Sequence, residues 1–258
     1  MKITSLFLSI VCSIICSAQV LNKKTSSHYK PSHPIGFKLS ETSTHTSLSY
    51  KITPSPLATS TPCNCKVATD TSFKIVPFIY QSGLIDTTLA NYPNYRNDDH
   101  ASAVIHLPFS FCYYGTQVDS CFINNNGNIS FKSQIYSFTA GGFPAKADTI
   151  MIAPFWADVD TRGPKSGVVR YKITPTALIV KWDTVGVFEM NDSLRNTFQL
   201  IITNGSDPIL PAGNNVSFCY GDMQWTTGTA SLGINGFGGT PATVGANKGD
   251  GVNYYSVW

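Results

Sequence analysis

Two acidic residues, Asp158 and Asp160, follow an apolar run at positions 150–157, and they are the side chains whose type and spacing could do chemistry. A pair of carboxylates can act as general acid and base on a glycosidic bond. On a strand, however, residues two positions apart project from the same face and lie close together. Their spacing therefore does not place them on opposite sides of a substrate, and we do not expect an enzyme.

The same two carboxylates could instead be structural or bind a metal. In the structural interpretation Asp158 and Asp160 accept N–H groups of the turn at residues 161–167, or they pair with Arg162 or Arg170. In the metal interpretation Asn or Asp oxygens from a neighbouring loop complete the all-oxygen shell that Ca²⁺ prefers. We expect the structural role, keep a calcium site at these two residues as the alternative, and expect no other cofactor.

Cysteines are the second group with chemical potential. Seven occur in the sequence and two of them lie within residues 1–18, which leaves Cys63, Cys65, Cys112, Cys121 and Cys219. An odd number in an exported chain means that at least one is free or pairs outside the chain. Cys112 and Cys121 flank a short turn, so we predict a disulfide between them across a hairpin, with Cys219 pairing with either Cys63 or Cys65.

The composition divides the chain into three parts. Residues 1–18 combine Lys2, an apolar stretch and the small residues Ser17 and Ala18, which is typical of a secretory signal peptide. Residues 19–62 are rich in Ser, Thr and Pro and cannot bury enough apolar surface to offset ordering entropy, so we expect a disordered leader. Residues 63–258 are expected to form one domain. The sequence predicts a secreted, extracellular mature chain without a membrane span.

The sequence of residues 63–258 favours a mainly β fold. Charged residues make up only 13% of the chain and aromatic residues 12%, and short apolar runs are bounded by Gly and Pro. We expect antiparallel sheets packed as a sandwich or barrel-like core with long loops. Trp156, Trp182 and Trp225 are expected in that core.

Individual strands can be assigned from the apolar runs. The dipeptide Asn126-Gly127 between two such runs predicts a hairpin, because both residues accept positive φ. Two further antiparallel pairs are expected, namely residues 168–173 with 177–182 and residues 196–205 with 216–220. Residues 73–80 are predicted to form one continuous strand.

Several motifs of this domain resemble the nidogen-like extracellular domain called NIDO. Residues 153–160, Ala-Pro-Phe-Trp-Ala-Asp-Val-Asp, are similar to its signature, and residues 122–131, Phe-Ile-Asn-Asn-Asn-Gly-Asn-Ile-Ser-Phe, are similar to its opening motif. Further motifs follow in order, so that the resemblance covers residues 105–255. This domain occurs in nidogen, alpha-tectorin, membrane mucins and secreted bacterial proteins.

The resemblance implies extracellular binding, namely cell–matrix or cell-surface adhesion through contacts with a protein or a glycan. Binding residues concentrate on loops held by a rigid scaffold, so we expect contacts at residues 84–100, 134–148 and 205–215. The net charge of +3 is spread along the chain without a basic cluster, which argues against a nucleic-acid partner.

Two alternatives belong to other functional classes. One is a secreted glycan hydrolase that uses Asp158 and Asp160. The other is a carbohydrate-binding module, in which exposed aromatic rings stack on sugars; the candidate rings are Tyr92, Tyr95, Tyr113 and Tyr114.

Overall fold

The computed structural model describes residues 10–11, 67–68, 70–79, 94–145, 149–212 and 214–257. The chain divides into two units, one of Met1–Ala18 with Cys63–Trp258 and the other of Gln19–Pro62. The unit Gln19–Pro62, assigned above to a leader, lies outside the described residues, and so does the predicted signal peptide apart from residues 10–11. No helix in the described ranges is long and apolar enough to cross a membrane.

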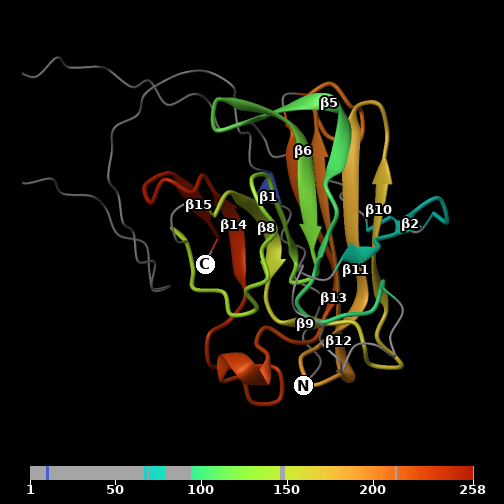
Figure 1. Cartoon of the computed structure of the whole chain (residues 1–258), viewed down its shortest axis with the longest axis vertical. Coiled ribbons are helices and arrows are strands. Elements are labelled where there is room, and N and C mark those ends of the chain that lie inside the picture. Colours follow the sequence, from blue (N-terminus) through green and yellow to red (C-terminus); the bar gives the residue numbers. More distant parts are fainter. Residues whose placement is uncertain are drawn as a thin grey trace, which may run out of the picture. The chain divides into compact units, whose positions relative to one another are not determined.

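The described part of the domain is mainly β, as predicted, and consists of two antiparallel sheets (Figure 1). The one helical element of this described part is the 3-10 helix η1 (Thr229–Ser231). The first sheet is formed by strands with this spatial order: β1 (Ile10–Val11), β13 (Val216–Met223), β12 (Asn191–Thr203), β11 (Ala177–Val187), β10 (Val168–Ile173) and β2 (Lys74–Ile75), with β9 (Val159–Asp160) paired to β11.

The second sheet contains the strands of the two motifs that carry the sequence resemblance. Its spatial order is β15 (Tyr254–Ser256), β14 (Thr243–Asn247), β8 (Met151–Trp156), β7 (Asn128–Ser130), β6 (Thr116–Asn124), β4 (Ala101–Ser102) and β3 (Phe78–Ile79), with β5 (Ile105–Tyr113) paired to β6. The predicted hairpin is confirmed, because β6 and β7 pair with Asn124 opposite Asn128, but of the Asn126-Gly127 dipeptide only Gly127 has a positive φ. The β10–β11 and β12–β13 pairs are confirmed as well.

Side chains from both sheets form the main hydrophobic cluster, which contains Trp182 and Trp225, while Trp156 packs in a smaller buried cluster with Met151 and Ala153. The Trp182 ring of β11 is fully buried and stacks on Phe198 of β12 at a centroid distance of 5.0 Å. Phe155 of β8 packs against both Phe198 and Trp225, with ring centroids 5.1 and 5.2 Å apart. Trp156, Trp182 and Trp225 are all buried, so their predicted place in the core is confirmed.

The predicted single strand at residues 73–80 is wrong. The segment instead forms two strands of two residues each, β2 in the first sheet and β3 in the second. Val76 still donates its N–H to Val169 O at 3.0 Å, but the next residue is Pro77. Proline has no N–H to donate to a ladder, so the segment leaves one sheet there and joins the other.

The predicted Cys112–Cys121 disulfide is also wrong, because Cys121 is a free, fully buried thiol. The β5–β6 hairpin turns tightly at Tyr114 and Gly115, so Cys112 lies opposite Gln117 and not opposite Cys121. The two cysteines are therefore four residues out of register, about 13 Å along a strand, and too far apart to bridge.

Cys112 and Cys219 are each disulfide-bonded in the structure. Cys63 and Cys65 lie outside the described residues. The pairing of Cys219 with Cys63 or Cys65 stays a prediction, and we now propose that Cys112 takes the other of these two cysteines.

Peptide mapping of the oxidised mature chain should find Cys121 as the thiol and Cys112 and Cys219 in bridged peptides. Burial raises the pKa of Cys121 to about 12, so alkylation of the native protein should leave it unmodified and alkylation after unfolding should label it. The Cys121→Ala variant should keep the same bridged peptides. A cross-linked peptide that contains Cys112 and Cys121 would contradict the register described here.

Candidate functional site

Three segments that are distant in sequence meet around the end of β8: residues 96–100, the β6–β7 turn at residues 125–127, and residues 157–162. Backbone hydrogen bonds join them, since Asn125 N donates to His100 O and Thr161 N donates to Asn97 O, each at 2.9 Å. The acidic residues Asp98, Asp99, Asp158 and Asp160 are brought together by this arrangement.

The asparagines of the turn are buried and hold the acidic segments in place. Asn125 Nδ2 donates to the backbone oxygens of Asp98 and Val159. Asn126 Nδ2 donates to Asp99 Oδ1 at 2.8 Å, and Asn126 Oδ1 accepts from Val159 N at 3.0 Å. The asparagine run thus forms the predicted hairpin turn and also positions the acids.

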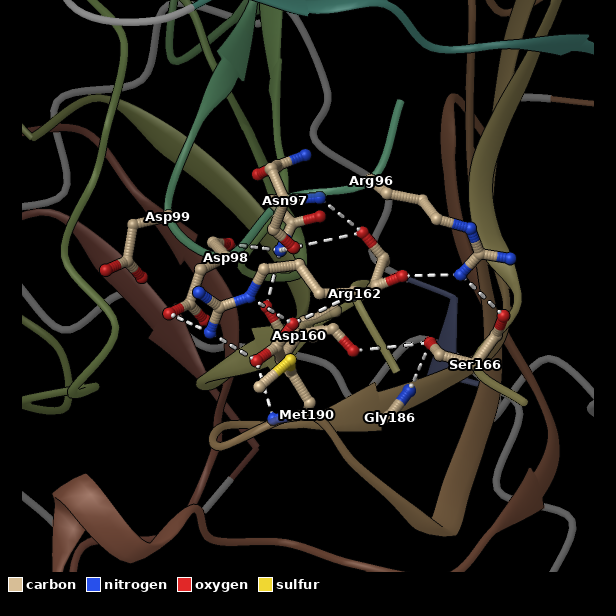
Figure 2. A network of polar contacts seen from close by, with 12 residues as sticks. Arg96, Asn97, Asp98, Asp99, Asp160, Arg162, Ser166, Gly186 and Met190 are labelled. Atoms are coloured by element: carbon tan, nitrogen blue, oxygen red, sulfur yellow. Dashed lines mark hydrogen bonds and ion pairs between the residues drawn. The ribbon is translucent and has the colours of Figure 1, made fainter. Parts of the chain in front are cut away.

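Asp160 has the structural role that the sequence predicted. It is fully buried, and its carboxylate accepts from Arg162 N and Nε at 2.9 Å, from Arg162 Nη2 at 2.6 Å and from Met190 N at 2.9 Å. Figure 2 shows Arg162 between Asp160 and Asp98. The Oδ2 atom of Asp98 lies 2.8 Å from Arg162 Nη2. Both oxygens of Asp160 are therefore engaged within the protein.

Asp158 is as buried as Asp160 but differs from it in its hydrogen bonding. Only 1% of its surface is exposed, and neither of its carboxylate oxygens has a hydrogen-bond partner among the described residues. Burial, followed by the negative charges of Asp99 and Asp160, raises the pKa of Asp158 to about 7. The predicted N–H donors of the turn at residues 161–167 do not reach this carboxylate.

Asp98 and Asp99 are half-buried and complete the acidic group. Burial and the charges of Asp160 and Asp99 raise the pKa of Asp98 to about 8, although the Arg162 guanidinium acts in the opposite direction. Burial also raises the pKa of Asp99, against the hydrogen bond from Asn126. The raised pKa values of Asp98, Asp99 and Asp158 have a common cause. Several carboxylates share a poorly solvated space with little compensating positive charge.

One carboxylate oxygen from each of Asp98, Asp99 and Asp158 lies within 4.8 Å of the others. The residue group that could hold a metal thus includes Asp158, which was proposed from the sequence, but not Asp160. Asp98 and Asp99 were not singled out from the sequence as ligands. In the sequence they are two adjacent acids between Asn97 and His100, and such a pair does not distinguish a ligand site from an ordinary polar loop.

Of the tyrosines suggested for sugar stacking, the three that the structure describes do not form an exposed platform. Tyr113 is only 2% exposed, and its hydroxyl donates to Met151 O at 2.6 Å and contacts Asn247 O at 3.1 Å. It continues the inward-facing alternation of Phe109 and Phe111 on β5, which is why it is buried. Tyr114 packs against the core, Tyr95 is half-buried, and Tyr92 lies outside the described residues.

Comparison with known proteins relates the chain to one protein family and to several much longer proteins. The family described as NIDO related matches residues 78–253. Alpha-tectorin of Mus musculus is 30% identical over 200 residues, which cover 64% of this chain and 9% of that protein. Nidogen of Drosophila melanogaster is 26% identical over 165 residues, which cover 53% of this chain and 12% of that protein. No solved structure matches the chain.

These relatives are far longer than the region that they share with this chain, which spans 9% of alpha-tectorin and 12% of nidogen. The matched range nevertheless contains both sequence motifs and all four acids of the site. The family match extends over most of the domain, and the chain belongs to the NIDO-related family.

Proposed function

We propose that the chain is a secreted extracellular adhesion module that binds a protein or a glycan of the extracellular matrix or of a cell surface. The observation that carries this proposal is the relation to alpha-tectorin and nidogen over most of the domain. The surface of the described domain supports it, because large apolar side chains are presented to solvent on one ordered loop.

That loop, residues 232–237, follows η1 and will be called the apolar loop. Leu232 and Ile234 are 78% and 77% exposed, and Phe237 is 42% exposed. Their exposure is not the result of a loose backbone, since Ile234 and Phe237 exchange N–H···O bonds of 2.8 and 3.2 Å and Gly233 N donates to Gly228 O at 2.9 Å. Neighbouring exposed apolar side chains on a rigid loop are typical of an interaction surface.

A second loop, which was expected from the sequence to make contacts, is bonded to η1 directly before the apolar loop. Thr139 Oγ1 and Ser231 Oγ are 2.8 Å apart, which joins residues 134–145 to η1. Phe138 on this second loop is 37% exposed. The loop at residues 205–215 contributes an exposed Ile209, whereas most of the loop at residues 84–100 lies outside the described residues. The apolar loop itself was not among the contact loops expected from the sequence.

The glycan hydrolase alternative receives no support from the acid geometry. Asp160 is fully buried and held by Arg162, and Asp158 is 1% exposed. A hydrolase needs one carboxyl group on each side of an accessible glycosidic bond. Neither acid is accessible to a polysaccharide in this arrangement, so adhesion remains the function that we propose.

Replacing both Leu232 and Ile234 with serine should weaken binding to immobilised matrix proteins, glycans or cells at least tenfold. The loss follows from removing the apolar area that a partner would cover. Because both side chains are already exposed, the melting temperature should stay within about 2 °C of the original. Surface plasmon resonance on a panel of matrix proteins and glycans would measure the binding.

A matched control is the Ile79→Ser, Val104→Ser double variant, which removes two apolar side chains that are each 44% exposed elsewhere on the domain. This control should bind like the unmodified chain. Equal binding by all three proteins would overturn the apolar loop as the contact surface. Absence of binding by the unmodified chain across matrix proteins, glycans and cells would overturn the adhesion function itself.

A further inference from the structure

We propose that Asp98, Asp99 and Asp158 form a binding site for one Ca²⁺ ion. Their three carboxylate oxygens lie within 4.8 Å of one another. Oxygens bound to a common Ca²⁺ at about 2.3–2.6 Å cannot be more than about 5 Å apart. The observed group meets this condition although its members come from two separate parts of the chain.

The surroundings of the individual carboxylate oxygens favour a cation as their partner. Both oxygens of Asp158 and Oδ1 of Asp98 are buried without a hydrogen-bond partner in the described part of the chain. An ionised carboxylate inside a protein is expensive unless it is paired or coordinates a metal. Asp160 is the contrast within the same cluster, because Arg162 and Met190 satisfy its oxygens. An ion beside Asp158 would do the same for the unsatisfied atoms.

The balance of charge supports a divalent cation. The cluster contains four carboxylates, those of Asp98, Asp99, Asp158 and Asp160, and Arg162 contacts two of them. Fully ionised, these five groups carry a charge of −3, and one divalent ion would reduce it to −1. Arg162 occupies Oδ2 of Asp98 and leaves Oδ1 available to an ion.

The ligands are held in place before an ion binds. Asn126 Nδ2 orients Asp99, and Asn125 Nδ2 binds the backbone oxygen of Asp98. The backbone oxygen of Asp158 accepts from Phe188 N at 3.1 Å. Carboxylate oxygens suit hard cations, and a shell of mixed carboxylates and water suits Ca²⁺, which takes six to eight oxygens. Because Asp98 and Asp99 are partly exposed, water can complete the shell.

The test is calcium titration of the mature chain, by isothermal calorimetry and by thermal melting in calcium or in chelator. We expect one ion per chain with a dissociation constant of about 10⁻⁵ to 10⁻³ M, and a rise in melting temperature at 5 mM Ca²⁺ of roughly 3–8 °C. Magnesium at the same concentration should produce a smaller rise. No binding heat together with identical melting curves would overturn the site, and an equal response to magnesium would overturn its assignment to Ca²⁺.

Asp158→Asn distinguishes a metal ligand from a structural acid. If Asp158 is a ligand, its replacement should abolish the calcium response. In chelator the variant should melt at or above the temperature of the unmodified chain, because a buried unpaired charge is gone. A structural acid would instead lower the melting temperature in both conditions. Asp119→Asn, an exposed acid on β6, is the control and should respond to calcium normally. A normal response by Asp158→Asn would overturn the proposal.

This proposal does not depend on the adhesion function. Calorimetry of the Leu232→Ser, Ile234→Ser variant should give the unmodified calcium affinity, since the apolar loop supplies none of the three carboxylates. If adhesion fails and calcium still binds, only the proposed function is overturned, and the reverse result would overturn only the calcium site.

Discussion

Replacing Arg162 with glutamine should lower the free energy of unfolding by about 3–5 kcal/mol in the presence of chelator. The guanidinium provides Nε and Nη2 to Asp160, which has no exposed side-chain surface, and Nη2 also contacts Asp98. Glutamine cannot replace that charge. Asp160 would remain buried with only two backbone N–H donors, those of position 162 and of Met190. Urea denaturation would measure the loss.

The matched control is Arg170→Gln, which breaks a surface ion pair. Arg170 Nε lies 3.9 Å from Asp183 Oδ2, and the two side chains are 36% and 31% exposed. Water screens such a pair, so its removal should cost no more than about 1 kcal/mol. A loss for Arg162→Gln as small as that of Arg170→Gln would show that the buried pair is not what stabilises the acidic segments.

Calcium should reduce the effect of Arg162→Gln if the ion binds where we propose. The variant removes the guanidinium that contacts Asp98 and Asp160, so the cluster of four acids has more negative charge for a divalent ion to compensate. The difference in melting temperature between calcium and chelator should therefore be larger for the variant than for the unmodified chain.

Gly127→Ala is the other substitution with a large expected effect, a loss of at least about 4 kcal/mol or failure to fold. A Cβ at this position would lie 1.8 Å from the backbone oxygen of Phe155, and Gly127 has a φ of +74°. The chain cannot move away easily, because Phe155 N donates to Gly127 O at 3.2 Å and thereby joins the turn to β8. Soluble yield and urea denaturation would measure the effect.

Gly115→Ala separates the close approach from the unusual backbone conformation. Gly115 also turns a hairpin, with a φ of +83°, but no described atom lies within 4 Å of the position that a Cβ would occupy there. Only the left-handed conformation opposes alanine at this residue, at a cost of about 1–2 kcal/mol. If the two alanine variants proved equally stable, the contact between the β6–β7 turn and β8 would not be as close as described.

Local patterns were sufficient to predict much of the fold. The Asn126-Gly127 hairpin, the β10–β11 and β12–β13 pairs and the burial of the three core tryptophans all follow from apolar periodicity and turn chemistry, which act between near neighbours. The order of the family motifs was also visible in the sequence. Pro77 was visible too, but we did not predict that it divides residues 73–80 between two sheets. A single missing N–H is enough to end the pairing of a strand within one sheet.

Within the site, the pairing of Asp160 with Arg162, two residues away, could be predicted from the sequence, and this local pair is found in the structure. The rest of the site depends on the three-dimensional fold. The fold set the hairpin register that separates Cys112 from Cys121, and it brought Asp98 and Asp99 beside Asp158. Register and the meeting of distant loops depend on hydrogen bonds between segments far apart in sequence, such as the one from Thr161 N to Asn97 O, and no local pattern encodes those partners.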